Sequence, residues 1–504
     1  MGKRSEKVAW SAALVVFVAH AIGNPHYGYF RDELYFIICG FHPAFGYVDQ
    51  PPIAPLLAAG SQLFGHSLFA LRLIPAAFAG AGVYATCRLA SALGGDEYAE
   101  VLAAVAFACT GVLTSFGMKV GPDMAGLWLW PLIALYMLRI VRGGDPRWWI
   151  AVGLAAGVAF ETKYTLVFFA IAMVVGLALT QHRRVLFSGW FVAGVAVAIA
   201  LALPNVIWQA VNNFPMLELL RNGHDEKNIH ASPLLYVFQQ ILITNLFFWP
   251  LWVIGLVAVL RDGAARFLGY AYVLLMAMMM VLGGKDYYPA DFYPILLAAG
   301  AVAVARWIHR PVWRAVVVTA VAIAGLIFVP FSLPVLSEQA MAAYSVRVQS
   351  ALGVHKSVLQ NERGANATLP NDWADMHGWP ELVAQVAATY NRLPPAERWQ
   401  TGIFTGNYGE AAAIDFFGPA LGLPPALSGH NNYWLWGPGL YNGSTLLEVG
   451  GHCFADEHAY ASATVVAYID DPWAMSYERH RPIALCRGAR MSLQQLWPKL
   501  RSYE

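Results

Sequence analysis

Charged residues are scarce in this chain of 504 residues. Asp, Glu, Lys and Arg together make up only 12% of it, against the ~25% that is usual in soluble domains, while 58% of the residues are hydrophobic. The net charge of +1 offers no excess of positive charge, so bulk charge does not favour a nucleic-acid-binding protein. The low charge indicates long apolar segments, and each of them has to be compared with the thickness of a membrane.

Apolar runs of membrane length account for the missing charge. A helix needs about 20 residues to cross a bilayer, and many of the 18 Trp and 23 Tyr residues stand at the ends of such runs, where amphipathic rings settle. The sequence predicts about eleven transmembrane helices, of which those at 148–161 and 164–180 are short and could be tilted or broken. The predicted spans are residues 8–22, 68–90, 99–117, 124–141, 148–161, 164–180, 189–208, 236–260, 266–283, 291–308 and 314–333.

Basic residues predict the orientation of these spans. Short cytoplasmic loops are enriched in Lys and Arg, so Lys3, Arg4 and Lys7 place the N-terminus in the cytoplasm. No small-residue cleavage site follows the first run, and we therefore expect an uncleaved span rather than a signal peptide. Every second loop continues the basic pattern, and an odd number of spans leaves residues 335–504 outside the cytoplasm. The basic residues of these loops are Arg88, Arg142, Arg147, Arg183, Arg184, Arg261, Arg266, Arg306, Arg310 and Arg314.

The last third of the chain has a different character. Short apolar runs such as TGIFTGNYG and ATVVAYID alternate with polar segments, which predicts a small α/β domain. The predicted fold class is a polytopic α-helical membrane protein, with a transmembrane domain at 1–334 and a soluble α/β domain at 335–504. Cys453 and Cys486 are the only cysteines of this tail, and they could pair in an oxidising compartment or remain two separate thiols.

Acidic residues stand at the outward ends of the predicted spans. The first outward loop, residues 23–67, is long and aromatic and predicts one or two helices along the membrane surface. Interfacial anchoring explains its aromatic residues, but it does not explain Asp32 and Glu33 after the first span, or Asp49 before the second. Charges beside apolar surface are costly and usually have a partner or a function. For Asp32 the alternative is a structural salt bridge to Arg31.

Four further outward turns carry charged residues on the same face. Asp123 lies between the third and fourth spans, where it could be functional or could cap a helix. Carboxylates at such an interface can act as a general base on a hydroxyl or bind a metal, and Lys or Arg beside Tyr can hold a phosphate at headgroup depth. An enzyme that transfers the sugar of a lipid-linked phosphosugar needs both a carboxylate and a phosphate-binding group. The candidates for binding the carrier phosphate are Lys163, Arg221, Lys285, Tyr287 and Tyr288.

The stretch RDELYFIICGFHPAFGYVDQPPIAPLLA resembles the first loop of the family-39-like glycosyltransferases of bacterial membranes. These enzymes are related to dolichyl-phosphate-mannose protein mannosyltransferases and to the lipid A aminoarabinose transferase. The resemblance continues through GPDMAGLWLW and GGKDYYPADFYPILLAAGAV and reaches GLPPALSGHNNYWLWGPG in the tail, so it covers nearly the whole chain. It implies the membrane glycosyltransferase fold called GT-C, and transfer of a sugar from a polyprenyl-phosphate donor to an acceptor.

The resemblance also implies catalytic roles. Asp32 matches the acid after the first span that acts as the catalytic base or orients the acceptor, and Glu33 and Asp123 complete the predicted catalytic set. Tyr287 or Tyr288 matches a tyrosine near the carrier phosphate.

A metal site is implied less completely. Asp49 matches a carboxylate that contributes to a metal site in the aminoarabinose transferase, so a divalent metal (Mg, Mn or Zn) is a candidate cofactor. The next residue is Gln50, where that enzyme has a lysine that meets the carrier phosphate. His224 and His230 are further candidate ligands, although an exposed loop histidine is more often plain surface.

One loop of the tail, GHNNYW, combines polar groups with aromatic faces of the kind that bind sugars. His430, Asn431 and Tyr433 are therefore candidate acceptor-binding residues. A structural turn packed on the membrane domain is the equal alternative.

The sequence supports one functional hypothesis and leaves others open. The hypothesis is a glycosyltransferase that moves a sugar from a polyprenyl-phosphate donor to lipid A, a glycan or a protein of the cell envelope; the bacterial inner membrane and the periplasmic tail follow from the resemblance. A flippase or transporter of lipid-linked sugars is one alternative, but such proteins often carry internal repeats and charges near the midplane, and here the charges gather at one face. A non-catalytic envelope-assembly subunit is another, and a ligase or polymerase with a pyrophosphate carrier is a third.

Overall fold

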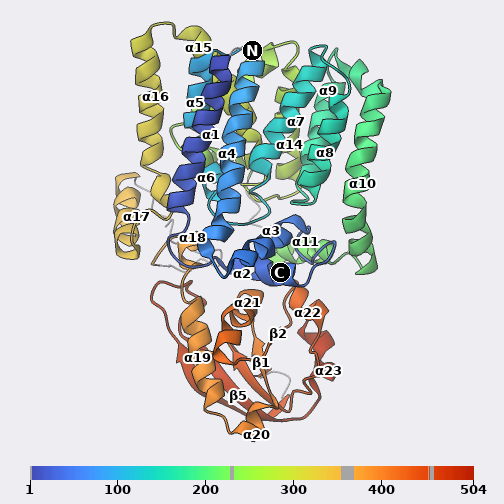
Figure 1. Ribbon diagram of the computed structural model, residues 1–504, viewed down its shortest axis with the longest axis vertical. Helices are drawn as coiled ribbons and strands as arrows, with labels where there is room; N and C mark the ends of the chain where they lie inside the picture. The colour runs from blue at the N-terminus through green and yellow to red at the C-terminus, as the bar shows by residue number, and fades with distance from the viewer. Residues whose placement is uncertain (1–2, 227–231, 353–367, 452, 455–458, 504) are drawn as a thin grey trace.

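The computed structural model describes residues 3–226, 232–352, 368–451, 453–454 and 459–503, which form two layers (Figure 1). A helical bundle carries the N-terminus at one end, and a domain with a β-sheet packs against the other end. Helices α2 (Arg31–Phe41), α3 (Ile53–Ser61) and α11 (Pro215–Glu226) lie between the two layers. The first outward loop therefore forms two helices, as its sequence predicted.

Each predicted span falls on one helix or on two consecutive helices. By length and composition, four helices of the described residues can cross a membrane (α1, α4, α10, and α15 with the turn before it), or five if one bent pair counts as a span. Shorter apolar helices fill the remaining positions, so the number of crossings stays a prediction. The bundle helices are α1 (Lys3–Gly23), α4 (Leu68–Ala92), α5 (Glu97–Ala108), α6 (Gly111–Phe116), α7 (Gly126–Val141), α8 (Trp148–Phe160), α9 (Leu166–Ala178), α10 (Gly189–Val211), α12 (Pro233–Thr244), α13 (Trp249–Arg261), α14 (Arg266–Val281), α15 (Tyr293–Trp307) and α16 (Pro311–Leu326), with 3₁₀ turns at Gln62–Phe64, Arg183–Phe187, Ala290–Phe292 and Val329–Phe331.

Two predicted spans are broken. α12 and α13 meet at a bend of 112°. At this bend Asn245 has a φ of 129°, and Pro250 stands in the first turn of α13 and has no amide to continue a helix. The prediction of one continuous helix over 236–260 is therefore wrong, because the positive φ ends one helix and the proline begins another. A second break, at Cys109 and Thr110, divides the span predicted at 99–117 into α5 and α6.

Burial within the bundle is uneven. Of the apolar window of α15, 89% is buried, against 50% for α4 and 11% for α10. α15 therefore lies at the centre of the bundle, whereas the sides of α10 face outward, as expected of a helix in contact with lipid. Gly255 of α13 and Gly300 of α15 each face the backbone of the other helix, so these two helices pack closely.

The C-terminal domain is built on a five-stranded sheet with the order β2-β1-β3-β5-β4. β1 is parallel to β2 and β3, and β5 is antiparallel to β3 and β4. The α/β architecture predicted for the tail is confirmed, and a disulfide between Cys453 and Cys486 of β5 decides between the two alternatives for these cysteines. The elements are α17 (Glu338–Leu352), α18 (Asn371–Ala374), α19 (Trp379–Asn391), α20 (Pro395–Arg398), β1 (Thr401–Thr405), α21 (Tyr408–Phe417), β2 (Ala426–Ser428), α22 (Asn432–Trp436), β3 (Thr445–Val449), β4 (Tyr460–Ile469), β5 (Arg481–Ala489) and α23 (Leu493–Leu496), with 3₁₀ turns at Gly418–Leu421 and Trp497–Leu500.

One apolar cluster joins the two layers. Leu34 and Ile38 of α2 pack in the same buried cluster as Val386 of α19 and Ile414 of α21. Since β1 and β2 run parallel, their carboxyl ends lie at the same edge of the sheet. The loops that leave this edge contact α2 and the segment that follows it. The junction of the two layers is therefore where side chains of both can meet.

Candidate active site

Asp32 lies in the first turn of α2, at the junction of the two layers. Its Oδ1 accepts a hydrogen bond of 2.7 Å from the hydroxyl of Tyr408 and stands 3.6 Å from the guanidinium of Arg31. The salt bridge to Arg31 is thus present, but 34% of the Asp32 side chain remains exposed. A carboxylate that is held on one side and accessible on the other can accept a proton from a bound substrate.

Asp49 is the second acidic group of this junction. The hydroxyl of Tyr35 donates a hydrogen bond of 3.1 Å to its Oδ1. Burial, together with the nearby charge of Asp32, raises the pKa of Asp49 to about 7. When two neighbouring carboxyl groups have different environments, their pKa values differ, and one group can keep its proton while the other is ionised.

Asn432, the first residue of α22, holds the loop that carries Asp49. Its side-chain oxygen accepts a hydrogen bond of 2.7 Å from the amide of Val48. Its own amide donates to the hydroxyl of Tyr35 at 3.3 Å. The C-terminal domain therefore contacts both acids of the junction, one directly and one through its neighbours.

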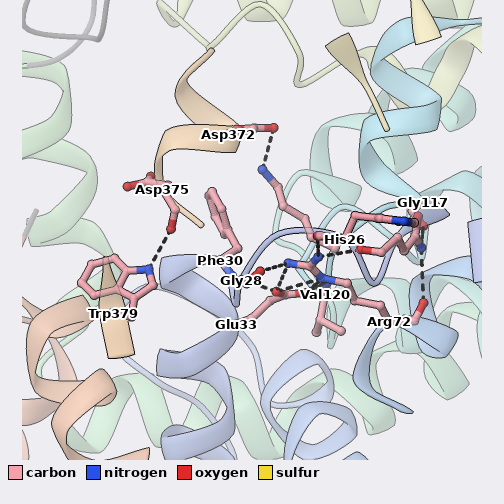
Figure 2. A network of polar contacts seen from close by, with 12 residues as sticks. His26, Gly28, Phe30, Glu33, Arg72, Gly117, Val120, Asp372, Asp375 and Trp379 are labelled. Atoms are coloured by element: carbon pink, nitrogen blue, oxygen red, sulfur yellow. Dashed lines mark hydrogen bonds and ion pairs between the residues drawn. The ribbon is translucent and has the colours of Figure 1, made fainter. Parts of the chain in front are cut away.

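Glu33, the next residue of α2, lies in a buried network with Arg72 (Figure 2). Its carboxylate meets the guanidinium of Arg72 with a shortest contact of 2.8 Å, and neither side chain has exposed surface. It also accepts hydrogen bonds from the amides of Phe30 and Val120. The oxygens of Glu33 are bonded and shielded, which favours a structural role over the catalytic role that the sequence predicted, and the network ties α2 to α4 and to the segment before α7.

A second group of predicted residues gathers around Lys163, which follows α8. Lys163 forms an ion pair with Asp123 and stands 5.0 Å from the ring centres of both Tyr287 and Tyr288. Lys285 stands 5.9 Å from the ring of Tyr287. The first turn of α7 has no side-chain cap, so the structure does not show Asp123 in the capping role. A cluster of amines and phenol rings of this kind can hold an anion.

A backbone contact connects the Asp49 loop with the Lys163 cluster. The amide of Ile53 donates a hydrogen bond of 3.1 Å to the carbonyl of Glu161. The turn after Asp49 therefore lies against the turn that carries Lys163. Asp49 and the Lys163 cluster therefore lie on the same face of the bundle.

One predicted phosphate-binding residue makes no described contact with this arrangement. Arg221 lies exposed on α11, and in the part of the chain that the structure describes no hydrogen bond or ion pair joins it to the Lys163 cluster. His230 and the side chain of His224 lie outside the described residues. Among the residues that the structure describes, no group of three or more His, Cys, Asp or Glu side chains is placed to hold a metal ion.

The predicted acceptor loop is largely packed against its surroundings. Tyr433 is 4% exposed and donates a hydrogen bond of 2.8 Å to Asp415, and Asn431 is 1% exposed. His430 borders the site, because its ring centre lies 4.9 Å from that of Tyr408. The packing of Asn431 and Tyr433 favours the structural alternative for these two residues.

The sequence reasoning missed Tyr408 and Asn432. Both follow buried strands that end at one edge of the sheet, and polar residues at the carboxyl ends of parallel strands are a known signal for sites. The order of the strands is needed to use this signal, and it was not predicted.

Comparisons with known proteins show what the sequence of this chain is similar to. The family model of dolichyl-phosphate-mannose-protein mannosyltransferase matches residues 49–208. Among curated proteins, an undecaprenyl phosphate-alpha-4-amino-4-deoxy-L-arabinose arabinosyl transferase of Pseudomonas fluorescens is 29% identical over 278 residues, which are 49% of this chain and 48% of that protein. The chain thus spans about half the length of the curated relative that it matches.

Solved structures share the fold over nearly the whole chain. ArnT from Cupriavidus metallidurans in the apo state matches with a TM-score of 0.61, covering 94% of this chain and 96% of that one at 16% identity. The same protein bound to undecaprenyl phosphate matches with a TM-score of 0.55. The mycobacterial arabinofuranosyltransferase AftD matches with a TM-score of 0.50 over 97% of this chain and 40% of that one. The GT-C fold and the resemblance to this family of membrane glycosyltransferases are confirmed.

Proposed function

We propose that the protein is a membrane glycosyltransferase that moves a sugar from a polyprenyl-phosphate donor to an envelope acceptor, which is lipid A, a glycan or a protein. The observation that carries the proposal is the placement of an accessible, oriented carboxylate, Asp32, on the same face as the Lys163 cluster. The similarity to an undecaprenyl phosphate-dependent arabinosyl transferase, and to an ArnT structure bound to undecaprenyl phosphate, supports this class of donor. We further propose that this face is periplasmic and that the N-terminus is cytoplasmic.

In the proposed reaction, Asp32 acts as the general base. The acceptor hydroxyl attacks the anomeric carbon and forms a new C–O bond, while its proton passes to the Asp32 carboxylate. The bond between the anomeric carbon and the phosphate oxygen breaks, and its electron pair leaves with the phosphate. A nearby ionised carboxylate also stabilises the positive charge that develops on the sugar in the transition state.

The phosphate of the carrier gains negative charge as it leaves. The ammonium groups of Lys163 and Lys285, with the hydroxyls of Tyr287 and Tyr288 close by, are the groups that would stabilise it. Lys163 is half-buried beside apolar rings, and a charge interaction is stronger there than in bulk water.

A metal is not assigned a step in this proposal. Asp49 accepts a hydrogen bond from a phenol, and burial raises its pKa to about 7. Among the described residues it lacks the further His, Cys or carboxylate ligands that a divalent metal requires.

Removal of the Asp32 charge should stop turnover and leave the fold intact. We expect purified Asp32→Asn to release free polyprenyl phosphate at least about 100-fold more slowly than the wild type, the range that general bases contribute. The assay offers a panel of polyprenyl-phosphate sugars with envelope extract as acceptor, with and without chelator. Asp470→Asn removes an exposed carboxylate at the end of β4 and serves as the matched control.

The outcomes separate the functional classes. Release that depends on Asp32 supports the transferase and names the donor. Wild-type rates in Asp32→Asn would exclude this residue as the base. Absence of release with every donor and extract would favour the flippase or the assembly subunit instead.

A further inference from the structure

The carboxyl edge of the C-terminal sheet supplies contacts to both acids of the membrane layer. β1 is followed by Tyr408, the first residue of α21, and β2 is followed by Asn432, the first residue of α22. Both loops leave the same edge because β1 and β2 are parallel. Tyr408 reaches Asp32, and Asn432 reaches the loop that holds Asp49.

The phenol of Tyr408 is held in place from several sides. Its ring packs on Tyr35, with the centroids 4.6 Å apart, and the guanidinium of Arg31 lies 5.3 Å from its centre. The ring of His430 stands edge-on at 4.9 Å. Burial raises the pKa of Tyr408 well above its ordinary value, so its hydroxyl stays protonated and donates to Asp32.

We propose that Tyr408 is a positioning residue for Asp32, so that the C-terminal domain completes the reactive site. The proposal rests on the proposed role of Asp32 as the base. The hydroxyl of Tyr408 donates to Oδ1, which fixes the plane of the carboxylate and leaves Oδ2 to take the proton of the acceptor. Contacts that orient a reacting group act by pre-organisation, so their loss lowers the rate of the chemical step more than the affinity.

Other charges face Asp32 from both layers. Arg31 stands 3.6 Å from it and also approaches Asp375, at 3.7 Å. The charge of Asp32 raises the pKa of Asp49 and of Asp375, so these two groups lie close to it as well. Replacement of Tyr408 by Phe removes one hydroxyl and leaves all of these charged groups in the chain, so a change in pH dependence then reports the hydrogen bond from the phenol.

The first test is the kinetics of Tyr408→Phe. We expect kcat to fall about 10- to 100-fold, the usual effect of losing a hydrogen bond to a charged group, while KM for the donor changes less than about twofold. The acid limb of the kcat profile should move to higher pH, since the hydrogen bond favours the ionised carboxylate. Tyr390→Phe is the matched control: it removes a phenol hydroxyl bonded to the Arg398 carbonyl in the same domain, and it should keep wild-type kinetics.

Two results would overturn the positioning role. One is an unchanged kcat and pH profile in Tyr408→Phe. The other is a lower kcat with an unshifted acid limb, which is what a merely structural role would give.

A second test needs no substrate. Carbodiimides modify protonated carboxyl groups, and mass spectrometry of the peptide that contains Asp32 reports the modification as a function of pH. We expect the midpoint for Asp32 to lie at higher pH in Tyr408→Phe than in the wild type and in Tyr390→Phe. A shifted midpoint in a protein that transfers no sugar supports the contact and overturns only the proposed function. An active wild type without the shift supports the function and overturns the positioning role.

Discussion

Asp32 and Glu33 are neighbours in the sequence and have opposite environments. Successive side chains of a helix point about 100° apart, so α2 directs Asp32 toward the C-terminal domain and Glu33 into the bundle. A buried carboxylate is stable only with a partner, and removal of one member of such a pair typically costs about 3–5 kcal/mol. Arg72 is that partner, which explains why this acid supports the structure while its neighbour remains accessible.

The buried Asp49 makes the stability of the protein depend on pH. Because its pKa is raised from 3.8 to about 7, its contribution to stability is complete below about pH 4 and is lost as the pH rises through 7. Asp49→Asn removes this titration, so at pH 8 its thermal midpoint should exceed that of the wild type by about 2–4 °C, and at pH 4 the two should coincide. Intrinsic fluorescence during heating in detergent measures the midpoints.

Asp470→Asn controls for the general effect of losing a carboxylate, because that side chain is exposed. A difference between Asp49→Asn and the wild type that is the same at pH 4 and pH 8 would contradict the assignment.

At the scale of elements, α12 contacts the loop that carries Tyr287 and Tyr288. The hydroxyl of Tyr236 donates to the carbonyl of Lys285 at 3.0 Å, and the side-chain amide of Gln240 donates to the carbonyl of Asp286 at 2.8 Å. Both donors lie on α12, before the bend. These two hydrogen bonds hold the backbone of the loop that follows α14.

The close packing of α13 on α15 should depend on two glycines. A Cβ built on Gly255 would overlap the carbonyl oxygen of Leu296, and one built on Gly300 would overlap that of Leu251. Small residues allow helix backbones to approach closely in membranes. We expect Gly255→Ala to destabilise the protein by about 1–3 kcal/mol or more through overpacking, measured as a lower thermal midpoint in detergent.

The matched control is Gly60→Ala on α3, where an added Cβ meets nothing within 4 Å. It should be neutral or slightly stabilising, because alanine is the better helix former. Equal midpoints for Gly255→Ala and Gly60→Ala would show that the two helices are less tightly packed than the structure indicates.

At the scale of the whole molecule, the two ends of the bundle carry different groups. The N-terminus lies at the end of the bundle away from the C-terminal domain, and α2, which carries Asp32, lies at the end next to it (Figure 1). The C-terminal domain itself holds the disulfide. Disulfides persist in oxidising compartments. The disulfide and the distribution of basic loops therefore favour the same orientation, with the C-terminal domain outside the cytoplasm.

Thiol labelling tests this orientation. Leu440→Cys introduces a thiol at a fully exposed position of the C-terminal domain, and Gln181→Cys introduces one at an exposed position between α9 and α10, at the opposite end of the bundle. An impermeant maleimide should label the first in intact cells and the second only after lysis. Labelling of the wild type measures the background from native thiols, and the reverse pattern would contradict the orientation.

The sequence by itself determined the elements whose formation is local. A membrane span is decided by the composition of about 20 consecutive residues, so the apolar segments and the basic loops could be recognised before any contact was known, while the number of crossings stays a prediction. The change to short alternating runs likewise predicted the α/β tail. Local pattern also located Asp32, Asp49, Asp123, Lys163 and the tyrosine pair at one face, because the alternation of spans assigns a side to every loop.

Only the tertiary structure decided which of these groups are accessible and which distant residues contact them. Asp32 and Glu33 differ by what packs against each side of α2, and no local pattern reports that packing. Tyr408 lies 376 positions from Asp32, and Asn432 lies 384 positions from Val48. These contacts exist because the parallel strands β1 and β2 present their carboxyl ends to α2, and such an arrangement arises from docking between distant segments rather than from any one of them.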